Sequence, residues 1–184
     1  RRDSEEKPTE IQLIGESAKL LNSFLLSTPE NPLADDAAFT MANVLFSLKK
    51  FTEVVEHANA CVGRYPESKH AGSFRYMEAL GSFWLRDYDA ALKAASEVAQ
   101  GSSEDKNLAA YITAQVYHAK GQPLQATPWY ERVKDIYPDA RESIAYFEQK
   151  MVRLDEVLVG IGHLLAEKQH RGVPLVFLGS QLGA

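Results

Sequence analysis

Residues 107–138, NLAAYITAQVYHAKGQPLQATPWYERVKDIYP, carry the clearest fold signal in this chain. Apolar residues recur at spacings of three and four on both sides of the segment KGQP (120–123), which predicts two amphipathic helices joined by a short turn. Small residues, Ala114 and Ala126, stand where the two helices have to touch. Tyr137-Pro138 ends the second helix, because proline cannot continue it. The stretch contains no catalytic motif, so its information lies in its packing pattern.

The same two-helix scheme occurs twice upstream, in residues 34–64 and 69–100. Aligned on their turns, the units place Phe51, Tyr88 and Pro123 at equivalent positions, 37 and 35 residues apart. Small or apolar residues follow at matching offsets in all units: Val54, Ala91 and Ala126, then Ala58, Ala95 and Tyr130, then Cys61, Val98 and Val133. Repetition with such a period predicts a solenoid, in which each unit buries its apolar face against its neighbours.

The pattern over residues 35–138 resembles the tetratricopeptide repeat (TPR), a helix–turn–helix unit of about 34 residues with small residues at two fixed positions. The resemblance implies an all-α, right-handed solenoid of about three TPR-like units, formed by residues 34–138. In the second unit either Ala79 or Leu80-Gly81 fits the small-residue contact, and the sequence leaves both alignments open.

Two linkers with the sequences YPES (65–68) and YPDA (137–140) are similar to those of bacterial envelope TPR proteins. This short similarity favours the cell envelope or periplasm over the cytoplasm.

Further helices are expected on both sides of the repeats, as caps for the apolar faces at their ends. Residues 1–33 comprise a charged lead-in and a packing helix from Thr9, its N-cap, to about Ser27. Residues 139–171 are predicted to form two capping helices, about Asp139 to Met151 and Leu154 to Gln169.

The tail, GVPLVFLGSQLGA (172–184), is apolar and is predicted to be extended, because the residue before a proline avoids helical backbone. It is either the beginning of a region that continues further or a segment that docks into a groove. Exposed, it would promote association, which favours burial in the chain's own groove or in a homo-oligomer contact. That contact would use Val173, Leu175, Val176, Phe177 and Leu178.

One irregularity stands in the third unit. Pro123 suits a helix start, but Pro128 inside the same helix would cost about 3 kcal/mol. We expect a bent or irregular turn between the two prolines, or a helix that begins at Pro128 with Thr127 as its cap.

Composition excludes several classes of function. The net charge of -5 and the absence of a Lys/Arg run argue against nucleic acid as a partner. Cys61 is the only cysteine, which excludes an internal disulfide and a cysteine-based zinc site. No apolar run is long enough to predict membrane insertion.

The sequence offers no catalytic, cofactor-binding or metal-binding residues, so we expect a protein that is not an enzyme and needs no cofactor. The five histidines are scattered without a His-x-x-x-His pair: His57, His70, His118, His163 and His170. No nucleophile elbow or phosphate-binding glycine loop is present.

The TPR resemblance implies a partner-binding groove lined by the first helix of each unit. Carried over residue by residue, the groove comprises Phe39, Asn43, Phe46, Tyr76, Leu80, Phe83, Trp84, Tyr111, Gln115 and His118. Rigid aromatic rings with a few polar groups are typical of protein-binding hot spots. A clamp for a C-terminal carboxylate is not expected, because Phe39, Leu108 and Ile112 stand where that subclass needs basic residues.

These features predict a scaffold or adaptor that binds a partner helix or extended peptide on an aromatic concave surface. The alternative is an architectural spacer or oligomerisation domain of a larger protein, with the groove filled by its own tail.

Overall fold

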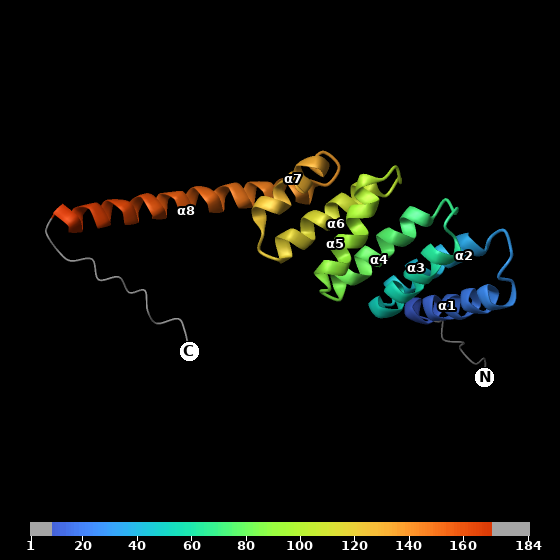
Figure 1. Ribbon diagram of the computed structural model, residues 1–184. Helices are drawn as coiled ribbons and strands as arrows, with labels where there is room; N and C mark the ends of the chain where they lie inside the picture. Colours follow the sequence, from blue (N-terminus) through green and yellow to red (C-terminus); the bar gives the residue numbers. More distant parts are fainter. Residues whose placement is uncertain (1–8, 171–184) are drawn as a thin grey trace, which may run out of the picture. The chain divides into compact units, whose positions relative to one another are not determined.

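The computed structural model describes residues 9–170, which form eight α-helices and contain no β-strand (Figure 1). The helices are α1 (Glu10–Ser27), α2 (Ala34–Ser47), α3 (Phe51–Arg64), α4 (Ala71–Trp84), α5 (Tyr88–Gln100), α6 (Lys106–Ala119), α7 (Pro123–Val133) and α8 (Pro138–His170). The predicted all-α class is confirmed. The lead-in (1–8) and the apolar tail lie outside the described residues.

The helices pair as the repeat pattern predicts, in three hairpins formed by α2 and α3, α4 and α5, and α6 and α7 (Figure 1). Each hairpin packs on the next, because α3 contacts α4 and α5 contacts α6. α1 packs on α2, as predicted for a helix before the array. Thr9 is the N-cap of α1 and forms a capping box with Gln12, which also confirms the predicted helix start.

Three alanines set the spacing of the hairpins. Ala42, Ala79 and Ala114 are each the ninth residue of a 14-residue helix, and each is fully buried. Ala79 is therefore the small-residue contact of the second unit. Gly81 has a different neighbour, because a Cβ there would lie 2.8 Å from Cγ2 of Val55 in the preceding hairpin. Ala79 thus takes the equivalent position to Ala42 and Ala114, and Gly81 is where α4 lies close to the preceding hairpin.

The turn inside each hairpin uses the same backbone conformation. Lys49, Arg86 and Gly121, each two residues before the second helix, have φ of 58°, 63° and 68°. Only glycine adopts this left-handed region without steric cost, so the first two units hold a side chain in a strained position. The third unit, which has the clearest sequence pattern, carries the residue that fits best.

The alternative of a helix that begins at Pro128 is wrong. α7 begins at Pro123 and continues through Pro128 to Val133, so Thr127 does not cap a new helix. The Thr127 hydroxyl instead donates to the carbonyl oxygen of Pro123, 2.9 Å away. Packing tolerates the proline, because Ala126, Tyr130 and Val133 on the same helix are all buried.

The two capping helices predicted after Pro138 are a single helix, α8. The expected break at Val152-Arg153 contains no proline or glycine, and Gly160 and Gly162 lie too far inside the helix to end it. The chain forms two compact units that divide after Arg141, so residues 9–141 and the later part of α8, from Glu142 onward, are described separately.

Candidate interaction surface

The first helices of the three hairpins line the inner side of the array. α2 contacts α4, and α4 contacts α6, whereas the second helices of the described hairpins have no contacts of comparable extent with one another. Helices that lie closer together are on the side of smaller radius. The exposed residues of α2, α4 and α6 therefore form the concave face.

The sixth residue of each of these helices is a half-buried aromatic: Phe39, Tyr76 and Tyr111. Phe39 stacks on His70, with ring centroids 4.6 Å apart, and Tyr111 stacks on Tyr137 at 4.8 Å. Burial raises the pKa of Tyr76 to about 12, so its hydroxyl stays protonated and can donate. Each ring therefore packs partly against neighbouring residues of the array, and its other side is accessible to solvent.

The tenth residue supplies the polar groups of the face. Asn43 is exposed, and its side-chain nitrogen donates to the carbonyl oxygen of Phe39 at 2.9 Å. Gln115 is half-buried and hydrogen-bonds to Tyr111, while the equivalent Leu80 packs against the core beneath. At this position the face is therefore polar in the outer units and apolar in the middle one.

The last predicted groove residues lie toward the helix ends. Phe46, Phe83 and His118 are each the thirteenth residue and are half-buried, while Trp84 is 55% exposed. The indole of Trp84 stacks on Phe51 at 5.5 Å. None of the ten predicted groove residues is buried in the core, and together they occupy three equivalent helical positions plus Trp84.

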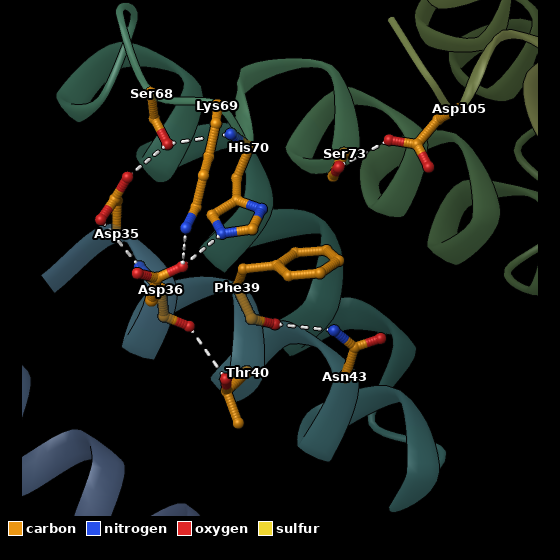
Figure 2. Close-up of polar contacts among 10 residues, drawn as sticks. All are labelled: Asp35, Asp36, Phe39, Thr40, Asn43, Ser68, Lys69, His70, Ser73 and Asp105. Atoms are coloured by element: carbon orange, nitrogen blue, oxygen red, sulfur yellow. Dashed lines mark hydrogen bonds and ion pairs between the residues drawn. The ribbon is translucent and has the colours of Figure 1, made fainter. Parts of the chain in front are cut away.

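A polar cluster at the start of α2 was not expected from the sequence (Figure 2). A carboxylate oxygen of Asp36 accepts from Nζ of Lys69 at 2.8 Å and from Nε2 of His70 at 2.7 Å (Figure 2). The hydroxyl of Ser68 donates to Asp35 at 2.6 Å. The linker before α4 is thereby tied to the first turn of α2 across the unit boundary.

Hydrogen bonds shift the titration of both carboxylates in the same direction. Those from Lys69 and then His70 lower the pKa of Asp36, and the hydrogen bond from Ser68 lowers the pKa of Asp35. Both carboxylates are therefore ionised over the physiological range.

The next boundary is also joined by polar contacts. The hydroxyl of Ser73 donates to Asp105 at 2.5 Å (Figure 2). A polar hollow of about 540 Å³ lies beside this pair, lined by Lys69, His70, Gly72, Ser73, Ser102, Ser103, Glu104 and Asp105. It brings side chains of both charges together beside this pair.

Features that would indicate chemistry are weak in the described chain. Burial raises the pKa of Cys61 to about 11, which keeps the thiol protonated and unreactive. Within residues 9–170, no group of three or more His, Cys, Asp or Glu side chains is arranged to hold a metal ion. No helix of the described part is long and apolar enough to cross a membrane.

Comparison with solved structures identifies the architecture. The chain superimposes on MamA with a TM-score of 0.62 at 16% identity, covering 90% of this chain and 98% of that one. The array is a tetratricopeptide-repeat fold. The nearly identical TPR-like repeats of a putative kinesin light chain from Podosopora anserina give a TM-score of 0.60 at 15% identity, covering 88% of this chain and 89% of that one. The MamA RS-1 double mutant gives 0.58 at 14% identity, covering 86% and 92%.

At these identities the likeness to TPR proteins concerns the fold alone. No family model and no curated protein sequence matches the chain. The envelope-type similarity of the linkers remains a prediction, because the names of these neighbours do not place them in the envelope.

Sequence reasoning missed Lys69 and Asp105 because they precede the helices that line the TPR groove. One signal was present: Asp36 and His70 are 34 residues apart, which is the length of one TPR unit. Phe51 was noted as a turn marker, and its stacking on Trp84 became visible only in the structure.

Proposed function

We propose that this chain is a non-enzymatic scaffold that binds a helix or extended peptide of a protein partner on the concave face of α2, α4 and α6. The carrying observation is the ladder of equivalent residues on that face. Phe39, Tyr76 and Tyr111 present partly accessible rings, with Asn43 and Gln115 beside them.

The physical basis is the conformational entropy that side chains lose when they become ordered on binding. Binding residues held on packed helices lose little freedom when a peptide docks, so more of the contact energy remains as affinity. The rings of Phe39 and Tyr111 are already fixed by stacking on His70 and Tyr137. Aromatic side chains that are rigid and half accessible suit hot spots of protein recognition.

The polar cluster supports the proposal by fixing the spacing of the rings. Asp36 joins the linker before α4 through Lys69 and His70, and the same His70 ring supports Phe39. A contact that holds the unit boundary therefore also orients one of the rings offered to a peptide.

A test can use peptides selected from a random display library on the wild-type chain. Asn43→Arg with Gln115→Arg adds two cations to the concave face, and the matched pair Asn59→Arg with Gln125→Arg adds two to exposed sites on second helices. We expect the first pair to weaken peptide binding at least tenfold and the second to leave it unchanged, at equal melting temperatures. Loss of binding in the second pair alone would place the site elsewhere.

The alternative, a groove filled by the chain's own tail, predicts a different outcome. Removing residues 172–184 would then raise the affinity for the selected peptides, because an internal competitor is gone. Unchanged affinity after this deletion would leave the scaffold proposal standing and remove the alternative.

Trp84→Ala offers a second check on the extent of the face. Because the indole is more than half exposed, its loss should weaken peptide binding while the helical circular dichroism stays intact. A collapse of helicity would show that stacking on Phe51 makes Trp84 structural.

A further inference from the structure

The later part of α8 presents an apolar face that the groove proposal does not use. From Met151 onward its apolar residues are 41% to 61% exposed: Met151, Val152, Leu154, Val157, Leu158, Val159, Ile161 and Leu164. The apolar stripe from Met151 to Leu164 is thus open to solvent on the helix itself.

This stripe keeps the spacing of three and four found in the hairpin helices, but it uses larger residues and they are exposed. The residues that define it alternate at three and four along the helix, a seven-residue repeat: Ile144, Phe147, Met151, Leu154, Leu158 and Ile161. A period of 3.5 keeps one seam facing a neighbouring helix along its whole length, as in coiled coils. Val157 and Leu164, seven residues apart, widen the seam on one side.

We propose that two copies of this chain associate through the later part of α8, with the two helices side by side and parallel. In the heptad defined by Met151 and Leu154, Lys150 and Asp155 flank the seam on opposite sides. Parallel pairing sets Lys150 of each copy against Asp155 of the other, whereas antiparallel pairing does not bring these opposite charges together. Charge complementarity therefore favours a second copy in this orientation.

The area of the stripe suits a helix as its occupant. Covering these exposed side chains in two copies would bury on the order of 1,200 Å² in total, the lower range of specific interfaces. A membrane surface fits less well, because the polar residues of this segment include Glu148, Asp155 and Glu156 beside Lys150 and Arg153. Helices that lie on anionic lipid carry an excess of Lys and Arg on the polar face.

Pairing would also change how the groove works. Two copies joined through α8 present two concave faces, and a partner with two binding segments would be held by both. This consequence follows only if the proposed function is correct, whereas the pairing itself does not depend on it.

The first experiment is the molar mass of the full chain by sedimentation equilibrium. We expect twice the chain mass for the wild type and the single-chain mass for Leu154→Asp with Leu158→Asp. Arg153→Asp with His163→Asp changes the outer side of the same helix and should remain paired. A wild type of single-chain mass over the micromolar range, or a seam variant that stays paired, overturns the proposal.

A deletion separates the helix from the tail as the source of association. The chain ending at His170 should keep the doubled mass if α8 makes the contact. A single-chain mass after this deletion would show that residues 171–184 hold the copies together, and the proposal would be wrong.

Orientation is tested by oxidative crosslinking in a Cys61→Ala background. Met151→Cys places a thiol on the seam, where parallel in-register pairing brings the two copies together, and Arg153→Cys places one on the outside. We expect a disulfide-linked dimer for the first variant only. Equal crosslinking of both, or none for Met151→Cys while the doubled mass persists, overturns the parallel arrangement.

Discussion

The repeat array, residues 9–141, and the later part of α8 are both helical and rich in apolar residues, yet they use them differently. The array buries alanine at its closest contacts, and Ala42, Ala58, Ala79, Ala95, Ala114 and Ala126 have no exposed surface. From Met151 onward α8 exposes leucine, valine and isoleucine. Small residues let helices of one chain approach closely, whereas large ones at a period of 3.5 leave a seam for another helix.

The largest effect should come from emptying the array's core. Phe74 is fully buried on α4 and contacts the rings of Tyr65 and Phe39, so Phe74→Ala should lower the free energy of unfolding by about 3–5 kcal/mol. Leu158→Ala, on the exposed stripe, should change array stability by less than about 0.5 kcal/mol. Urea titrations followed by circular dichroism measure both, and similar losses would contradict the distinction between the two regions.

Glycine-to-alanine substitution should have opposite signs in the two regions. A Cβ on Gly72 would lie 2.6 Å from Cβ of Ser103, so Gly72→Ala should destabilise the array by about 1–3 kcal/mol through overpacking. Gly160 has nothing within 4 Å of such a Cβ, so Gly160→Ala should favour the helix by about 1 kcal/mol.

Thermal melts and helical circular dichroism distinguish these outcomes. Combining Gly72→Ala with Ser103→Gly, which removes the clashing side chain, should restore part of the loss. A Gly72→Ala variant as stable as the wild type would mean that Ser103 moves away from α4 at little cost.

The three equivalent turns allow a finer comparison inside the array. Gly121→Ala should cost about 1 kcal/mol, because alanine at φ 68° meets the left-handed steric penalty. Arg86→Gly removes the same penalty and should be neutral or slightly stabilising, since the flexible glycine offsets part of the gain. Chemical denaturation measures the free energy of unfolding of both variants. A destabilised Arg86→Gly would show that the Arg86 side chain stabilises the fold by more than its left-handed backbone conformation destabilises it.

The smallest effect concerns acid. The folded-state pKa of Asp36 lies below its usual 3.8, so its contribution to stability is present above about pH 4 and is lost as pH falls through the lowered value. Asp36→Asn should therefore reduce stability slightly at pH 7 and flatten the decline below about pH 4. Acid titrations monitored by circular dichroism test this, with Glu56→Gln at an exposed position of α3 as a control that keeps the contacts between units intact.

Much of the fold followed from the sequence because repetition averages out local ambiguity. Three copies of one apolar pattern located the hairpins, and Pro and Gly marked their ends. The wrong expectations concerned single events: a break in α8 without a helix-breaking residue, and a helix start at Pro128. Local rules predicted both, and the cost of Pro128 is offset by the buried side chains on either side of it.

The candidate site was predictable in position and less so in its contacts. The TPR resemblance named residues such as Phe39 and Tyr111, which lie at equivalent helical positions as expected. It did not indicate that Phe39 stacks on His70, or that His70 also binds Asp36. Those contacts join residues about one repeat apart, which meet only when the units stack.

The amino-acid order alone specifies the helices, their pairing and the concave face, because these depend on periodicity and on small residues at fixed intervals. The side chains that link one unit to the next, and the apolar residues that stay exposed, depend on how the helices pack in three dimensions. Stacking brings Ser68, Lys69 and His70 onto α2. On α8, the stripe from Met151 to Leu164 is exposed. An amphipathic pattern predicts which face of a helix is apolar, but it does not predict which other element covers that face.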